Sequence, residues 1–136
     1  MIELFADTSY WVALINPRDE LHSKARSVSR EFASARVITS EMILTELLNG
    51  FSEGGPWLRG GAARAVEALR GNQSVRIVAQ TTEQFRNAVK HYEQFGDKSW
   101  SLTDCASFQI MKEHGIRAAL TRDVHFAQAG FDTLLR

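Results

Sequence analysis

The chain has 136 residues, 44% of them hydrophobic and only two of them proline, which fits one ordered domain with its own core and excludes a disordered protein. It has 16 basic and 16 acidic residues and no net charge, which counts against a protein that holds nucleic acid by bulk electrostatics, but only mildly against a nuclease with a local grip. The single cysteine, the missing secretory signal and the short apolar runs predict a cytoplasmic protein without a membrane segment.

Short apolar runs alternate with longer helical patterns along the chain. Runs rich in branched or large apolar residues predict buried strands at 2–6, 36–39, 75–79 and 117–121, with a weaker one around 133–135. Helical patterns lie between them at about 9–16, 20–34, 40–52, 57–72, 82–95 and 102–114. This alternation predicts an α/β fold, a three-layer α/β/α sandwich around a central parallel sheet of four to five strands.

Glycine and proline mark several boundaries. Pro17 breaks the first helical pattern, and Gly115 is expected to follow the helix over 102–114 as its C′ residue. The segment 52–61, SEGGPWLRGG, predicts the tip of a helical hairpin around 40–72 rather than a linker between domains. The whole chain, 1–136, is therefore expected to form a single domain.

Asp7 ends the first apolar run. An acid just past a buried parallel strand lies at the ligand-binding end of the sheet. The alternative is that Asp7 only caps the helix that starts near Ser9, which is a common role for aspartate. The local pattern supports both interpretations equally.

Asp104 opens a helix that is apolar almost all round. Ser101 and Asp104 fit a capping box, in which the acid bonds back to the backbone of the cap residue. The helix is nevertheless expected to be largely buried, and a buried acid needs partners or a metal ion. Capping and ligand binding are compatible here.

Glu46 and Asp123 are weaker candidates when each is taken alone. Glu46 falls on the flank of its helix with Thr45 and Asn49, which is typical of a solvated face. Asp123 follows the strand over 117–121 and could be an ordinary turn or capping residue. Asp7 and Asp123 follow strands, and Glu46 and Asp104 lie on helices that follow strands, so all four acids could converge on one edge of the sheet. Such a cluster predicts a site for a divalent cation, and hence a metal-dependent phosphodiesterase.

Several motifs together resemble the PIN-domain ribonucleases, specifically the VapC-type toxins of VapBC toxin–antitoxin pairs. These are FADTSYW at the start, ILTELLNGF, WSLTDCASF and ALTRDVHFAQAGF, and the resemblance covers essentially the whole chain. It implies a PIN-like fold and a metal-dependent endoribonuclease with RNA as substrate, a cognate antitoxin and a homodimer. It also implies an acidic site that is catalytic and binds Mg²⁺ or Mn²⁺, made of Asp7, Glu46, Asp104 and Asp123.

Further residues are candidates around that site. The resemblance suggests supporting roles for Thr8, Asp97 and Thr121, and contacts with RNA for Lys98, Arg122 and His125. His125 could alternatively act in acid–base chemistry, although a lone histidine near a loop is more often a surface residue. Because the acidic cluster is expected to contain no histidine or cysteine, zinc is disfavoured relative to Mg²⁺ and Mn²⁺.

Three other functions compete with this interpretation. Receiver domains and aspartate-nucleophile phosphatases share the fold class, but they need paired acids after the first strand, whereas Asp7 is followed by Thr8 and Ser9. A non-catalytic binding module on the same fold would not need four acids. A PIN nuclease of RNA processing stays open, and the short chain favours a toxin only by family analogy.

Overall fold

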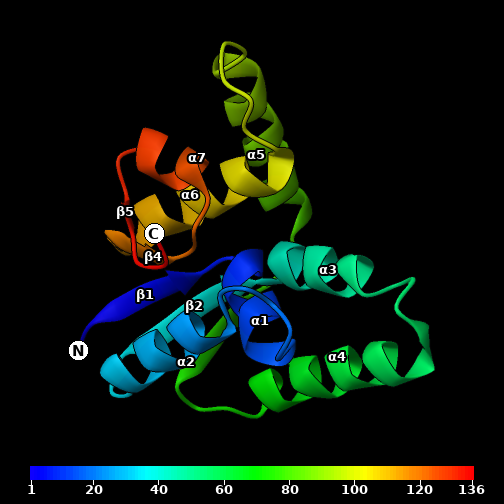
Figure 1. Ribbon diagram of the computed structural model, residues 1–136. Coiled ribbons are helices and arrows are strands. Elements are labelled where there is room, and N and C mark those ends of the chain that lie inside the picture. The colour runs from blue at the N-terminus through cyan, green and yellow to red at the C-terminus, as the bar shows by residue number, and fades with distance from the viewer.

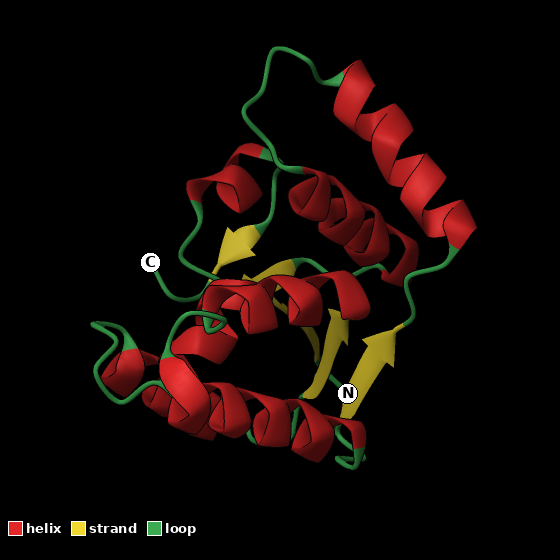
Figure 2. Ribbon diagram, turned by 90° about the vertical axis from the view of Figure 1, so that its right-hand side faces the viewer, coloured by secondary structure: helices red, strands yellow, loops and turns green.

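A five-stranded sheet with helices on both sides forms the protein, as the computed structural model of residues 1–136 shows (Figures 1 and 2). All neighbouring strands are parallel, in the order β3-β2-β1-β4-β5. The strands are β1 (Glu3–Ala6), β2 (Arg36–Ser40), β3 (Val75–Val78), β4 (Ala118–Leu120) and β5 (Asp132–Thr133). The predicted α/β class and parallel sheet are confirmed, including the short last strand.

Seven helices cover the sheet. In Figure 1, α1, α2 and α4 lie on one side of it and α5, α6 and α7 on the other, while α3 contacts both α1 and α6. The helices are α1 (Thr8–Ile15), α2 (His22–Glu31), α3 (Glu41–Gly50), α4 (Gly55–Arg70), α5 (Thr82–Gln94), α6 (Leu102–His114) and α7 (Val124–Gln128). None of them has the length and apolarity that a bilayer span requires.

The strand order places a switch point between β1 and β4. The chain runs outward from β1 through β2 to β3, then returns to the opposite side of β1 with β4 and continues to β5. In open parallel sheets, a crevice forms beyond the carboxyl ends of the strands at such a reversal, and ligands bind there. The residues that follow β1 and β4 therefore have the favoured position for a functional site.

The structure differs from the prediction in one boundary and in one additional helix. The hairpin of α3 and α4 has a tip of only 51–54, because α4 already starts at Gly55 with Pro56 in its first turn. Proline suits that position, since the first turn of a helix leaves its N–H groups without partners. The prediction that all of 52–61 forms the tip was wrong, and the short helix α7 was not predicted at all. Gly115 does end α6 in the left-handed conformation, with φ 65°.

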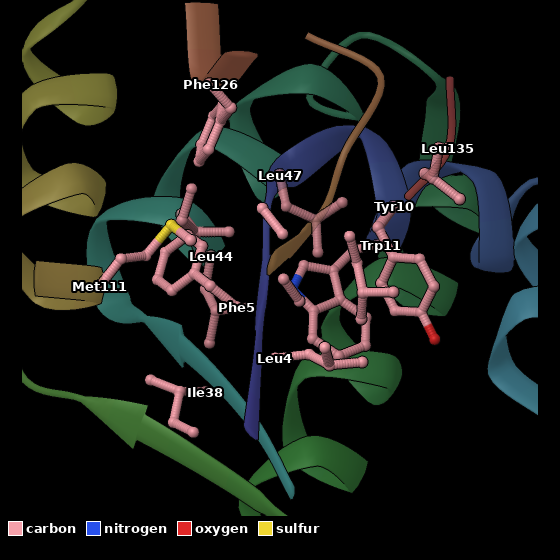
Figure 3. Close-up of a cluster of buried hydrophobic side chains, with 14 of the residues drawn as sticks. Leu4, Phe5, Tyr10, Trp11, Ile38, Leu44, Leu47, Met111, Phe126 and Leu135 are labelled. Atoms are coloured by element: carbon pink, nitrogen blue, oxygen red, sulfur yellow. The ribbon is translucent and has the colours of Figure 1, made fainter. Parts of the chain in front are cut away.

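An aromatic stack anchors the elements around the switch point. Phe126 of α7 is fully buried, with its ring centroid 6.3 Å from that of Phe5 on β1 and 4.9 Å from that of Phe108 on α6. Figure 3 shows Phe126 above Phe5 and Leu44 in the buried cluster. The stack therefore ties α7, which has only five residues, to the strand and helix on which it packs.

Replacing Phe126 with alanine tests this anchor. Phe126→Ala is expected to lower the free energy of unfolding by about 3–5 kcal/mol, because it removes a buried ring and leaves a cavity. Urea unfolding followed by circular dichroism measures the change. The control is Val124→Ala on the same helix, which removes a side chain that is 46% exposed and should change stability by less than about 0.5 kcal/mol. Equal effects of the two substitutions would contradict the assigned role of the stack.

Candidate metal-binding active site

The pairing of β1 with β4 sets the position of Asp7. Phe5 lies opposite Ala119 and Ala6 opposite Leu120, and the Asp7 N–H continues the ladder by donating to the Leu120 carbonyl at 3.2 Å. In this register, the residue beside Asp7 is Thr121. Its hydroxyl donates to Asp7 Oδ2 at 2.7 Å, so the two residues that follow the paired strands bond directly across the switch point.

The Asp7 carboxylate does not cap α1. Asp7 has extended backbone angles at the cap position, but its side chain accepts no capping hydrogen bond from the helix. The structure therefore removes the alternative that capping alone explains this residue. What remains is an acid that is only 6% exposed and that directly follows β1 at the carboxyl edge of the sheet.

Burial raises the pKa of Asp7 from 3.8 to about 7. Loss of hydration disfavours the charged form, and the hydrogen bond from the Thr121 hydroxyl together with the adjacent Thr8 backbone N–H offsets only part of that cost. The negative charges of Asp104 and Glu46 raise the pKa further, so three of the acids lie within electrostatic reach of one another. Because a bound cation would relieve both the desolvation and the repulsion, the surroundings of Asp7 suit a metal ion.

Asp104 combines both of the roles considered for it. Its Oδ2 accepts from the Ser101 N–H at 3.0 Å, and the Ser101 hydroxyl accepts from the Asp104 N–H at 3.0 Å, which completes the predicted capping box. The same Oδ2 also lies 3.0 Å from Nδ1 of His125. Asp104 is only 7% exposed, so the cap holds a buried carboxylate beside the other side chains of the site.

Asp123 and His125 reach the site from the start of α7. Asp123 caps this helix, accepting from the His125 N–H at 2.9 Å, and its own N–H donates to the Thr121 hydroxyl at 3.0 Å. His125 Nδ1 lies 3.5 Å from Asp123 Oδ1. Three side chains form a compact set of potential metal ligands, with one ligand atom of each within 4.8 Å of the others: Asp104, Asp123 and His125.

The position of His125 corrects the sequence interpretation. The cluster was expected to contain no histidine, and this was the reason for disfavouring zinc, but the His125 ring faces two of the carboxylates. Nor is it an isolated surface residue, since its side chain is 26% exposed. The spacing could have shown this: a residue two positions after a capping aspartate lies in the first turn of the helix, close to that aspartate.

Glu46 lies at the open side of the site. It is exposed on α3 together with Thr45 and Asn49, as its position on the flank predicts. The hydroxyl of Thr8, the residue after Asp7, nevertheless donates a hydrogen bond to its carboxylate. Glu46 therefore belongs to the surroundings of Asp7 rather than to the closest set around His125.

Three other candidates are not brought to the acids. Asp97 is exposed in the segment after α5 and pairs with Lys98, with 3.5 Å between Nζ and Oδ2, and no hydrogen bond or ion pair joins either residue to the four acids. Arg122 pairs with Glu20 on the surface, which raises the pKa of its guanidinium.

Sequence reasoning also missed Ser9, whose hydroxyl lies 3.3 Å from that of Thr121.

Comparison with known proteins identifies the relatives of this chain. The family model for the PIN domain matches residues 4–132. The chain is 34% identical to the 23S rRNA-specific endonuclease VapC20 of Mycobacterium tuberculosis, in a match that covers 94% of this chain and 95% of that protein. The crystal structure of M. tuberculosis VapC20, described as a sarcin-ricin loop cleaving toxin, superposes with a TM-score of 0.80 at 30% identity, covering 94% of this chain and 95% of that one.

Two more distant structures share the fold alone. FitAcB from Neisseria gonorrhoeae has a TM-score of 0.60 at 18% identity, covering 96% of this chain and 95% of that one. VapBC2 from Rickettsia felis, bound to a DNA fragment from its promoter, has a TM-score of 0.64 at 12% identity, covering 98% and 97%.

The raised pKa of Asp7 predicts a pH-dependent loss of stability in the metal-free protein. A carboxyl whose folded pKa exceeds its unfolded value stabilises the fold below pH 3.8, and this stabilisation is lost as the pH rises to about 7. Relative to Asp7→Asn, the wild type should lose about 1.4 kcal/mol of unfolding free energy per pH unit within that window.

Urea unfolding in the presence of a chelator, at several pH values between 5 and 8, measures this difference. Asp97→Asn is the control, because Asp97 is exposed and its replacement should leave the pH dependence unchanged. A difference between wild type and Asp7→Asn that stays constant with pH would refute the assigned surroundings of Asp7.

Proposed function

This chain belongs to the PIN-domain family, and we propose that it is a VapC-type endoribonuclease that cleaves ribosomal RNA as the toxin of a VapBC toxin–antitoxin pair. The observation that carries the proposal is the buried carboxylate of Asp7 at the switch point, with Asp104 and Glu46 near enough to raise its pKa. The match to a curated endonuclease across 94% of the chain supports it.

We assign the metal site to Asp7, Glu46, Asp104 and Asp123, with Mg²⁺ or Mn²⁺ as the ion. When bound, such a cation activates water and stabilises the charge that develops on the phosphate during in-line displacement. The side chains around the acids hold them in place. Thr121 donates to Asp7, and the Ser101 backbone donates to Asp104, so both buried carboxylates are oriented before any ligand arrives.

Proton release is part of cation binding in this proposal. Asp7 has a pKa of about 7 in the metal-free protein, so near neutral pH a large share of the molecules hold a proton on this carboxyl. A cation that uses Asp7 as ligand must displace this proton, and its affinity therefore rises with pH through that range. No side chain needs to act as nucleophile.

The proposed substrate is the large ribosomal RNA at its sarcin-ricin loop, since the relative that shares 34% identity is described as specific for 23S rRNA and as cleaving that loop. With zero net charge, the chain lacks the strong general attraction to RNA that a basic protein has. A folded loop recognised by its shape close to the site is compatible with such a chain.

The proposed partners are a cognate antitoxin that covers the site and a second copy of this chain. Trp57 is a candidate contact for the antitoxin, because it is 78% exposed in the first turn of α4, and exposed aromatic side chains are common in the centres of interfaces. Both partners are what the resemblance to VapC-type toxins implies, and light scattering tests the homodimer.

Substitution of the buried acids tests the activity. Asp104→Asn and Asp7→Asn should each lower the rate of cleavage of purified ribosomes by at least about 100-fold, because the loss of a ligand carboxylate removes several kcal/mol of transition-state stabilisation. Primer extension across the sarcin-ricin loop measures the cut. Circular dichroism must show that the variants are folded.

The control for this experiment is Asp97→Asn, which removes an acid that does not contact the cluster and should leave cleavage within about twofold of wild type. In cells, induced expression of the wild type should stop growth, and Asp104→Asn should relieve the arrest. Full cleavage by the Asp7→Asn, Asp104→Asn double variant would refute the proposed enzyme.

Removal of the cation tests the metal requirement. A chelator should abolish cleavage, and added Mg²⁺ or Mn²⁺ should restore it, since the acids alone provide neither a nucleophile nor a positive charge. The same ions should raise the melting temperature of the wild type at pH 8 but not that of Asp104→Asn. Cleavage that persists in excess chelator would contradict the assignment.

A further inference from the structure

We propose that His125 is a direct nitrogen ligand of the active-site cation and that it makes this site prefer Mn²⁺ and Co²⁺ to Mg²⁺. The inference rests on the proposed function in one respect, namely that the acidic cluster binds a divalent cation. It goes further by giving the ion a mixed set of oxygen and nitrogen ligands in place of the all-carboxylate set.

The distances around Nδ1 of His125 match those between neighbouring ligands of one ion. Nδ1 lies 3.0 Å from Asp104 Oδ2 and 3.5 Å from Asp123 Oδ1. Two ligands at right angles, each about 2.1 Å from an octahedral ion, lie about 3.0 Å apart. The Nδ1–Asp104 distance equals this spacing, the Nδ1–Asp123 distance is 0.5 Å longer, and one ligand atom from each residue lies within 4.8 Å of the others, which is close enough for a shared cation.

The His125 ring is held in this position from two sides. Its backbone N–H donates to Asp123 Oδ1 at 2.9 Å, and the next residue, Phe126, is fully buried in the aromatic stack. The side chain is 26% exposed, and no protein group bonds Nε2. Nδ1 is therefore the ring atom that faces the two carboxylates, and Nε2 is not engaged by the protein.

The other histidines have different surroundings. Nδ1 of His22 bonds the Ala13 carbonyl at 2.6 Å, and Nδ1 of His114 bonds the Ile110 carbonyl at 2.9 Å. His91 lies in an aromatic cluster with Phe95 and Trp100. Of the four histidines in the chain, His125 alone faces carboxylates.

A nitrogen ligand changes which ion is bound best. Mg²⁺ is a hard ion that prefers oxygen ligands, whereas imidazole suits the first-row transition metals, whose affinity rises from Mn²⁺ to Co²⁺. If His125 only oriented Asp104 by a hydrogen bond, its removal would weaken all three ions by the same factor. The ratio of affinities therefore separates a ligand from a positioning residue.

The experiment compares full-length wild type, His125→Ala and the control His114→Ala, all stripped of metal with a chelator. Electron spin-echo envelope modulation of the Mn²⁺-loaded wild type should show a directly bound imidazole nitrogen, and His125→Ala should lose that signal. Calorimetric titration should show at least about a tenfold loss of Co²⁺ affinity in His125→Ala, with Mg²⁺ affinity changed by less than about threefold. His114→Ala removes a histidine at the far end of α6 and should change neither.

Two results would overturn the inference. One is a wild-type Mn²⁺ spectrum without nitrogen coupling, which does not depend on whether the variant folds. The other is an equal loss of Mg²⁺ and Co²⁺ affinity in His125→Ala. In either case, a wild type that still binds Mn²⁺ and cleaves RNA leaves the proposed function standing, whereas a wild type that binds no cation and cleaves nothing refutes that function itself.

Discussion

The parallel pairing of β1 with β4 is the constraint on which the site depends. Because the ladder continues to the Asp7 N–H, the carboxylate of Asp7 lies beside the hydroxyl of Thr121 and away from water. A buried acid at this place is unfavourable for the empty protein, as its raised pKa shows. The folded protein thus holds the charged form of Asp7 at an unfavourable free energy, which a bound cation can relieve. A carboxylate that is already in place and poorly hydrated would therefore bind a cation more strongly.

The supporting groups hold one site from several elements. Thr121 contacts both Asp7 and the backbone of Asp123, so the ends of β1 and β4 and the start of α7 share one hydroxyl. Below them, the ring of Phe126 packs on β1 and α6, which fixes α7 relative to Asp104. The hydrogen bonds of Thr121 at the sheet edge and the packing of Phe126 beneath it therefore both fix the start of α7, where Asp123 lies.

Sequence patterns identified the parallel sheet and its acids because these depend on local signals, such as a buried strand before Asp7 or a capping box around Asp104. The helix α7 has five residues, too few for a periodic pattern, and His125 was therefore a candidate for RNA contact or acid–base chemistry but was not expected among the carboxylates. The tip of the hairpin was overestimated because glycine and proline near Gly55 signal a turn and a helix start alike. The contact of Glu46 with Thr8 depends on how α3 packs on α1, and no local pattern contains that information.

The acids come from four segments that are far apart in the chain, at residues 7, 46, 104 and 123. No fragment of the protein contains all of them, and no single helix or hairpin brings two of them together. The proposed site therefore exists only in the completely assembled domain, and under this assignment a partly unfolded molecule is inactive however much secondary structure it keeps. Under the same assignment, a mutation or protease that opens the domain abolishes activity without changing any of the four acids, so the amount of active protein in a cell follows its global stability.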